Sequence, residues 1–161
     1  MTIYIHSKTQ TLSFIKNDTL VAQYPISTAS NGLGEQKNSF KTPRGWHSIR
    51  AKIGKDLPLF SVFRARRATG EIFNNALYKH FPTRDWILTR ILWLSGTEVG
   101  VNRLGHVDTM QRFIYIHGTH DEKNIGQPNS KGCIRMLNKD IAQLFDLVST
   151  GDSVWIGEGE L

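Results

Sequence analysis

The chain has 161 residues, a usual length for one domain and enough to bury a hydrophobic core without disulfides or metals. Hydrophobic residues make up 39% and charged residues 21%, which excludes an intrinsically disordered chain. The net charge of +6 is compatible with a nucleic acid, a carboxylate-rich substrate or simple solubility. The densest basic run, residues 64–67, comes with no nucleic-acid-binding signature, so no nucleic-acid partner is expected.

The N-terminus starts directly with an alternating pattern, Thr2 to Ile5, and carries no basic leader followed by an apolar segment. No stretch approaches the length of a membrane-spanning helix, so no membrane partner is expected. For a complete chain this predicts a cytoplasmic protein. For a mature form whose signal has been removed, it predicts a periplasmic one.

The first fifty residues read as short strands separated by polar turns. A long loop rich in Gly, Asn and Ser covers residues 30–39, and long loops often border functional sites. Thr42-Pro43-Arg44-Gly45 reads as a turn in which proline fixes φ. Alternating apolar residues predict strands over 2–6, 12–15, 19–27 and 46–50, the first two forming a hairpin.

The middle of the chain is harder to interpret, because Pro58, Gly70 and Pro82 interrupt any long element between residues 52 and 85. Only short helical pieces fit there. Beyond it, the apolar run 86–94 and the run 111–117 predict two buried strands, expected to lie near each other in the core sheet.

One amphipathic helix is expected near the C-terminus. Asn138 is a good N-cap, and Gly151 would end the helix. The apolar positions 141, 144, 145 and 148 follow the helical spacing, and residues 153–156 predict a closing strand. With no linker or internal repeat, the sequence predicts a single mostly β (α+β) domain over residues 1–161, with one prominent helix.

Cys133 is the only cysteine, and it follows His117 by sixteen positions. A lone cysteine is either a small buried hydrophobe or a functional thiol. A thiol is mostly protonated at neutral pH, so a nucleophilic Cys133 would need a base such as His117. Gly132 would let the backbone N–H groups of residues 132 and 133 form an oxyanion hole, and Arg135 offers a fork for a carboxylate.

A metal site is the competing interpretation of the histidines. His117 and His120 stand three apart, with His106 and Asp108 upstream, but neither an HExxH nor a CxxC pattern accompanies them. The remaining histidines, His6, His47 and His80, are isolated and read as structural or surface residues.

At these residues the sequence resembles the L,D-transpeptidase (YkuD-type) catalytic domain family. His117-Gly118-Thr119, a loop with Ile125-Gly126, and Ser130-Lys131-Gly132-Cys133-Ile134-Arg135 resemble the family signature. The opening hairpin, the strand 19–27 and the Thr-Pro-x-Gly turn resemble its N-terminal part, so the resemblance covers essentially the whole chain. The family usually has histidine before Gly-Cys, where this chain has Lys131, which keeps a positive charge near the thiol.

The resemblance implies a β-sandwich or barrel with a helix after the cysteine loop, acting on peptidoglycan stem tetrapeptides without cofactor or metal. Cys133 would attack the carbonyl of the L-centre of the third stem residue and expel D-alanine. His117 would act as base and acid, held by the Gly118 carbonyl, with the Gly132 and Cys133 N–H groups as oxyanion hole. Ser130, Lys131 and Arg135 would bind substrate, and Arg135 reads equally well as a structural residue of the cysteine loop.

Three functions stay open at this point. Without an export signal, an L,D-carboxypeptidase that trims recycled tetrapeptides in the cytoplasm is favoured. The alternative is an L,D-transpeptidase that makes 3-3 cross-links in the wall. A non-catalytic peptide-binding module with an inert Cys133 is a third interpretation. A monomer is expected, and residues 79–85 or 31–38 are candidates for a lid over the site.

Overall fold

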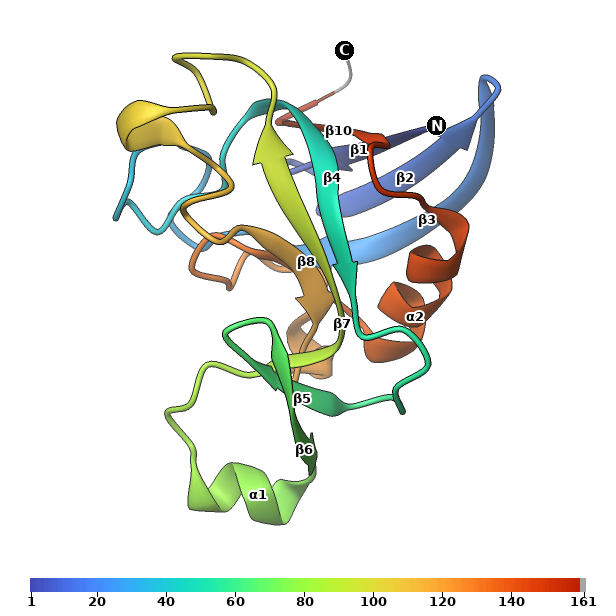
Figure 1. The fold of residues 1–161 in the computed structure, drawn as a ribbon, viewed down its shortest axis with the longest axis vertical. Helices are drawn as coiled ribbons and strands as arrows, with labels where there is room; N and C mark the ends of the chain where they lie inside the picture. The colour runs from blue at the N-terminus through green and yellow to red at the C-terminus, as the bar shows by residue number, and fades with distance from the viewer. Residues whose placement is uncertain (160–161) are drawn as a thin grey trace.

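The computed structural model describes residues 1–159 and is dominated by β-strands, as the sequence predicts (Figure 1). The helices are α1 (Asn75–His80) and α2 (Asn138–Leu147), with 3₁₀ turns at Gly105–Val107 and Glu122–Asn124. The strands are β1 (Thr2–His6), β2 (Thr11–Lys16), β3 (Thr19–Ser27), β4 (Gly45–Ile53), β5 (Ser61–Arg64), β6 (Arg67–Ile72), β7 (Ile87–Gly96), β8 (Tyr115–Gly118), β9 (Ile134–Met136) and β10 (Ser153–Gly157). Among residues 1–159, no helix combines the length and the apolar character needed to cross a membrane.

The strands form one sheet that closes on itself. Its order is β4-β10-β1-β2-β3-β9-β8-β7-β5-β6, and an additional pairing of β4 with β7 completes a ring. The hairpin β5–β6 branches from β7 outside this ring. The pairs β1–β10 and β8–β9 are parallel and the others antiparallel. Closure removes most free sheet edges, which would otherwise be open to pairing with another chain.

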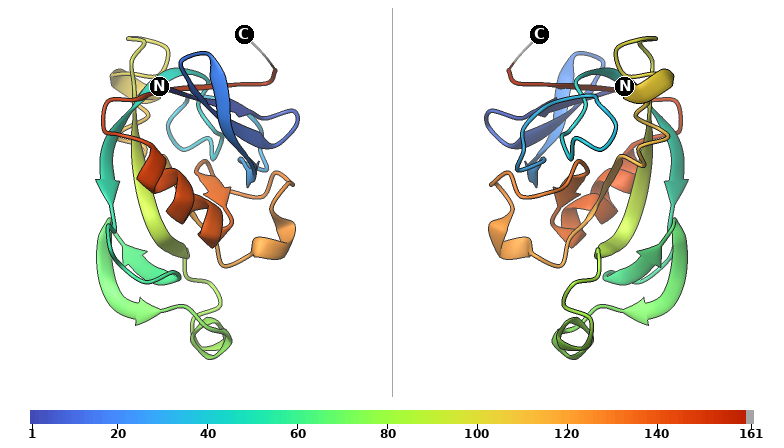
Figure 2. Two further views of the ribbon diagram at one scale, coloured as in Figure 1. Left: turned by 90° about the vertical axis from the view of Figure 1, so that its right-hand side faces the viewer. Right: turned by 90° about the vertical axis from the view of Figure 1, so that its left-hand side faces the viewer.

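Alternating strand residues and one face of α2 fill the interior. On β1 the fully buried Ile3 and Ile5 alternate with partly exposed residues, as expected for a strand with one face on the core. The helix packs against β7 and β8 and buries Ile141, Leu144 and Phe145 in the same core (Figure 2). The strand expected over 86–94 is β7, and it lies near β8 in the sheet as predicted, paired with it antiparallel.

The C-terminal helix differs from its prediction at both ends. Leu137, not Asn138, is the N-cap, and the Asn138 side chain is buried inside the protein instead of capping the helix. The helix ends at Leu147, before Gly151, which lies in the following turn with a φ of +94°. Tertiary hydrogen bonds available to the buried amide outweigh the local capping preference.

Two further segments differ from the sequence prediction. The strand expected over 111–117 begins only at Tyr115, because residues 111–113 form a turn and Phe113 has a φ of +56°. Residues 52–85 contain the hairpin β5–β6 and the short helix α1. A short helix was expected in this segment, but the hairpin was not. The hairpin turn places Ala65 and Arg66 at positive φ, the backbone of a tight two-residue turn.

Candidate active site

The parallel pair β8–β9 sets the geometry of the site. His117 is in register with Arg135, and side chains two residues apart on a strand share one face. Tyr115 lies two residues earlier on β8 and Cys133 immediately precedes β9, and both line one cavity together with His117 and Arg135. The intervening Ile116 and Ile134 point into the core and are fully buried. The sequence thus places the predicted nucleophile and base on one side of two neighbouring strands.

Thr42 anchors the cysteine loop. Its hydroxyl donates to the Gly132 carbonyl at 2.9 Å and accepts the Ala29 N–H at 3.0 Å, with the residue fully buried. Gly132 has a φ of +133°, and a Cβ there would lie 3.2 Å from Ile114 Cδ1 and 3.4 Å from the Lys41 carbonyl. The Thr-Pro turn and the Gly-Cys loop, ninety positions apart, are therefore one structural unit, and residue 132 must be glycine.

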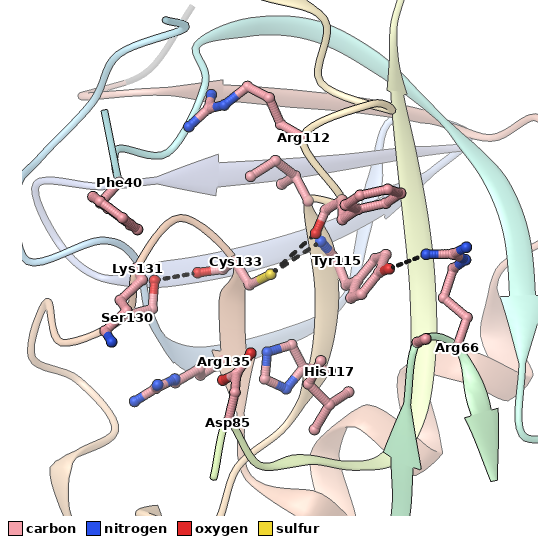
Figure 3. A pocket seen from close by; sticks show the side chains of 14 residues that line it. Phe40, Arg66, Asp85, Arg112, Tyr115, His117, Ser130, Lys131, Cys133 and Arg135 are labelled. Atoms are coloured by element: carbon pink, nitrogen blue, oxygen red, sulfur yellow. Dashed lines mark hydrogen bonds between the residues drawn. The ribbon is translucent and has the colours of Figure 1, made fainter. Parts of the chain in front are cut away.

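The Cys133 sulfur lies against the backbone of the preceding strand segment. Its Sγ accepts the Tyr115 N–H at 3.4 Å and donates to the Phe113 carbonyl at 3.5 Å (Figure 3). Burial raises the pKa of the thiol to about 11, an effect that the Tyr115 hydrogen bond opposes. The free protein therefore holds a neutral thiol at neutral pH, and a base must remove its proton during attack.

His117 is oriented by the residue that follows it. Its Nδ1 lies 2.7 Å from the Gly118 carbonyl, and because a carbonyl only accepts, Nδ1 carries the proton and Nε2 is the basic nitrogen. Burial lowers the pKa of His117 to about 4, so the ring is neutral at pH 7. The buried Asn138 supports this strand end, donating to the Thr119 carbonyl at 2.7 Å and accepting from the Thr89 hydroxyl at 2.5 Å.

The two predicted oxyanion-hole donors differ in availability. The Gly132 N–H donates to Ser130 Oγ at 3.2 Å, while that hydroxyl donates to the Cys133 carbonyl at 2.5 Å. None of the hydrogen bonds found within residues 1–159 uses the Cys133 N–H. Ser130, predicted to bind substrate, thus closes the turn around the cysteine, and the Cys133 amide is the free donor beside the sulfur.

A cavity of about 510 Å³ opens over the sulfur. Arg135 faces it and binds Asn129 only by longer contacts, 3.3 Å to the carbonyl and 3.5 Å to Oδ1. The exposed Lys131 lies at its rim. Figure 3 shows the side chains of the wall, which include Phe40, Arg66, Asp85, Arg112, Tyr115, His117, Ser130, Lys131, Cys133 and Arg135. The structure thus brings all the side chains of the predicted site together around one cavity.

Several wall residues were missed by the sequence analysis. Arg66, from the β5–β6 turn, donates to the Tyr115 hydroxyl at 2.9 Å and stacks on Phe113 with its guanidinium carbon 4.8 Å from the ring centre. Arg112 holds the 34–41 loop, with its shortest bond to the Lys41 carbonyl at 2.6 Å. Of the two lid candidates, the segment 79–85 contributes Asp85 to the wall, and the loop 31–38 is followed by Phe40.

The histidines of the alternative metal site make different contacts. His120 stacks on Tyr78 with ring centres 5.5 Å apart, and His106 lies in the 3₁₀ turn Gly105–Val107. Within residues 1–159, no group of three or more His, Cys, Asp or Glu side chains is placed to hold a metal ion. Of the isolated histidines, His47 is a buried structural residue whose Nε2 lies 3.0 Å from Thr109 Oγ1.

A neutral cysteine just before β9 and a tautomer-fixed histidine on β8, beside a free backbone amide, form the kind of arrangement that cysteine-dependent acyl transfer requires. The family model of the L,D-transpeptidase catalytic domain (YkuD) matches residues 1–156. The chain therefore belongs to the L,D-transpeptidase catalytic domain family.

Individual relatives agree with this assignment. The chain is 51% identical over 41 residues to the L,D-transpeptidase-family protein YkuD of Bacillus subtilis (strain 168), covering 26% of this chain and 25% of that protein. It is 24% identical over 154 residues to YqjB of the same strain, covering 96% and 69%. The alignment with YkuD thus spans about a quarter of that protein.

Solved structures share the fold. An L,D-transpeptidase from Mycobacterium smegmatis superimposes with a TM-score of 0.56 at 18% identity, over 97% of this chain and 58% of that one. LdtMt1, solved in complex with imipenem, gives a TM-score of 0.58 at 17% identity, also over 97% and 58%. The chain thus spans just over half of these structures, and the likeness at this identity concerns the fold.

Proposed function

We propose that the chain is a cysteine acyl-transfer enzyme that cleaves peptidoglycan stem tetrapeptides at the bond before the terminal D-alanine. The observation that carries this proposal is the shared face of β8 and β9, on which Cys133 and the Gly118-anchored His117 line one cavity. The family assignment supports the same chemistry and substrate class.

The proposed reaction starts from a neutral pair. Because burial raises the pKa of Cys133 to about 11 and lowers that of His117 to about 4, the neutral thiol and imidazole are favoured over a thiolate–imidazolium pair before substrate binds. His117 Nε2 takes the thiol proton as the sulfur attacks the carbonyl of the third stem residue. The Cys133 N–H stabilises the oxyanion. The C–N bond then breaks, the proton passes from His117 to the leaving amine, and D-alanine departs from a thioester.

The flanking cations have separate tasks in this scheme. Arg135 faces the cavity with donors beyond its long contacts to Asn129, so it both stiffens the loop and offers hydrogen bonds to a substrate carboxylate. Lys131 stands where the family usually has histidine. A lysine ammonium has three donors and no acceptor, so Lys131 supplies positive charge at the rim and does not take the place of an imidazole acceptor.

The thioester has two fates. With free tetrapeptides and no amine acceptor, water resolves it, which is the L,D-carboxypeptidase activity we propose first. Cross-linking by an amine is the second candidate, favoured by a groove of about 270 Å³ that meets the cavity at Phe40, Phe113 and Lys131. A second peptide could enter there. Action on recycled peptides in the cytoplasm stays a prediction.

The test is incubation with a purified tetrapeptide ending in D-alanine, read by mass spectrometry. Loss of one alanine supports hydrolysis, and a dimer mass with loss of one alanine supports cross-linking. The Cys133→Ala variant is the matched control, since it removes the sulfur and leaves the cavity. If neither product forms and the Cys133→Ala variant behaves like the parent, the catalytic proposal fails and the chain is instead a binding module with an inert cysteine.

A further inference from the structure

The cavity over Cys133 has one carboxylate among several cations. Arg66, Arg112, Lys131 and Arg135 line it, and of the wall residues within 1–159 only Asp85 carries a negative charge. Asp85 is exposed, and it takes part in no hydrogen bond or salt bridge found in the described part of the chain. Asp85 therefore contributes no stabilising contact of this kind to the fold, and its carboxylate is free to bind a ligand in the cavity.

Two of the cations are already engaged by the protein. Arg66 binds the Tyr115 hydroxyl and stacks on aromatic rings, and Arg112 binds the carbonyls of the 34–41 loop. Arg135 is different, because its contacts to Asn129 are long and use one nitrogen. Within residues 1–159, Asp85 and Arg135 form no salt bridge with each other. Both charges therefore keep binding capacity toward the cavity.

The two charges also flank the reacting groups. Figure 3 shows Asp85 and Arg135 on the side of Cys133 where His117 lies. Burial dominates the pKa of both His117 and Cys133, followed by their backbone hydrogen bonds. After these, the Asp85 carboxylate raises and the Arg135 guanidinium lowers the pKa of both groups. Each charge is thus within electrostatic reach of the nucleophile and the base.

We propose that Asp85 and Arg135 together recognise a free α-amino acid head group, with its ammonium on Asp85 and its carboxylate on Arg135. An unpaired acid and an unpaired guanidinium facing one cavity match the two charges of such a zwitterion. The inference rests on the proposed function, in which the head group belongs to the side chain of a diamino dicarboxylic acid in the stem. Asp85 is then the residue that makes the enzyme select stem peptides whose third residue carries a side-chain ammonium over stem peptides without one.

The test compares three tetrapeptides: one with diaminopimelate, one with its side-chain amine acetylated, and one with its side-chain carboxyl amidated. Acyl-enzyme formation is followed by intact mass in the parent, in Asp85→Asn, and in Asp146→Asn as a matched control on the exposed face of α2. In the parent and the control, acetylation should lower the acylation efficiency about tenfold.

The Asp85→Asn variant should be acylated by the diaminopimelate peptide about tenfold less efficiently than the parent, and acetylation of the peptide should cost nothing more. Amidation should still lower the efficiency, because Arg135 is intact. If Asp85→Asn changes the effect of acetylation only in the step in which a second peptide resolves the thioester, and not in acyl-enzyme formation, the proposed role in recognising the donor peptide is overturned. Equal acetylation ratios in parent and variant, or equal slowing of all three peptides, would overturn the proposal.

Measuring peptide affinity in a variant without the cysteine tests the role of Asp85 independently of the proposed reaction. In the Cys133→Ala background, Asp85→Asn should weaken affinity for the diaminopimelate peptide about tenfold and leave affinity for the acetylated peptide unchanged. Absence of any acyl-enzyme in the parent would refute the proposed function, and the binding result would still decide the role of Asp85. Unchanged affinity for the diaminopimelate peptide refutes that role.

Discussion

Replacing Thr42 with valine removes the hydroxyl that joins the Thr-Pro turn to the cysteine loop and keeps the side-chain shape. The Ala29 N–H and the Gly132 carbonyl, both buried, lose their partner. An orphaned buried group costs about 1–3 kcal/mol, so the two together should lower the free energy of unfolding by about 3 kcal/mol. In a domain of this size that corresponds to a fall in Tm of about 9 °C.

Thr42→Ser is the matched control, because it keeps the hydroxyl and loses one methyl group. It should cost about 1 kcal/mol, a fall in Tm of about 3 °C. Differential scanning calorimetry gives both values, and D-alanine release at 25 °C should drop at least tenfold in Thr42→Val but little in Thr42→Ser, because a loosened loop misplaces the sulfur. The reasoning fails if Thr42→Val melts within 2 °C of the parent, or if the serine variant loses as much.

Three further predictions concern the site and its titration. His117→Asn should lower the acylation rate about a thousandfold without weakening peptide affinity in the Cys133→Ala background, as loss of a general base requires; a loss below tenfold in stopped-flow acylation would contradict that role. Burial lowers the pKa of both His47 and His117 to about 4. Below pH 6.5 these two histidines are therefore protonated in the unfolded chain before they are protonated in the folded protein. Stability should therefore be full above pH 6.5 and fall by about 3 kcal/mol per histidine as the pH drops toward 4, measured by urea unfolding; a flat profile would refute the buried neutral state. Gly132→Ala should cost about 2 kcal/mol and most of the activity, since φ there is +133° and the new Cβ lies 3.2 Å from Ile114; calorimetry and alanine release at full parental values would show that the loop relaxes freely.

The strands of the ring were predictable because one face of each is buried. Burial imposes alternation on β1 and on most of β10, and the limits of β1, β2 and β10 fall within two residues of the predicted ones. The hairpin β5–β6 lies outside the ring. Residues Arg67–Ile72 are almost entirely exposed, so no apolar alternation marks that strand in the sequence.

Local preference failed where tertiary contacts override it. Asn138 has the right side chain for an N-cap, yet its amide binds Thr119 and Thr89 inside the protein. Phe113 continues an apolar run that predicts a strand, yet it lies in a turn, with a positive φ and a half-exposed ring. The carbonyl of Phe113 accepts the hydrogen bond from the Cys133 thiol. Sequence patterns do not encode either of these long-range arrangements.

The candidate site was predictable only where its residues stand in short motifs. His117-Gly118 and Gly132-Cys133 are local patterns, and their parallel pairing brings them together. Asp85 has no neighbouring motif. It reaches the cavity because it lies two residues before β7, which pairs with β8 through Leu88 and Gly118. Such a residue is identified only when strand pairing is known.

The most direct test of the account is to map the acyl-enzyme. The protein is mixed with a D-alanine-terminated tetrapeptide, quenched in acid at short times and digested, and the modified residue is located by mass spectrometry. The account predicts an adduct equal to the tetrapeptide minus alanine on Cys133, formed as fast as D-alanine appears and absent from Cys133→Ala. Release of D-alanine by Cys133→Ala at the parental rate, or an adduct on any other residue, would contradict it.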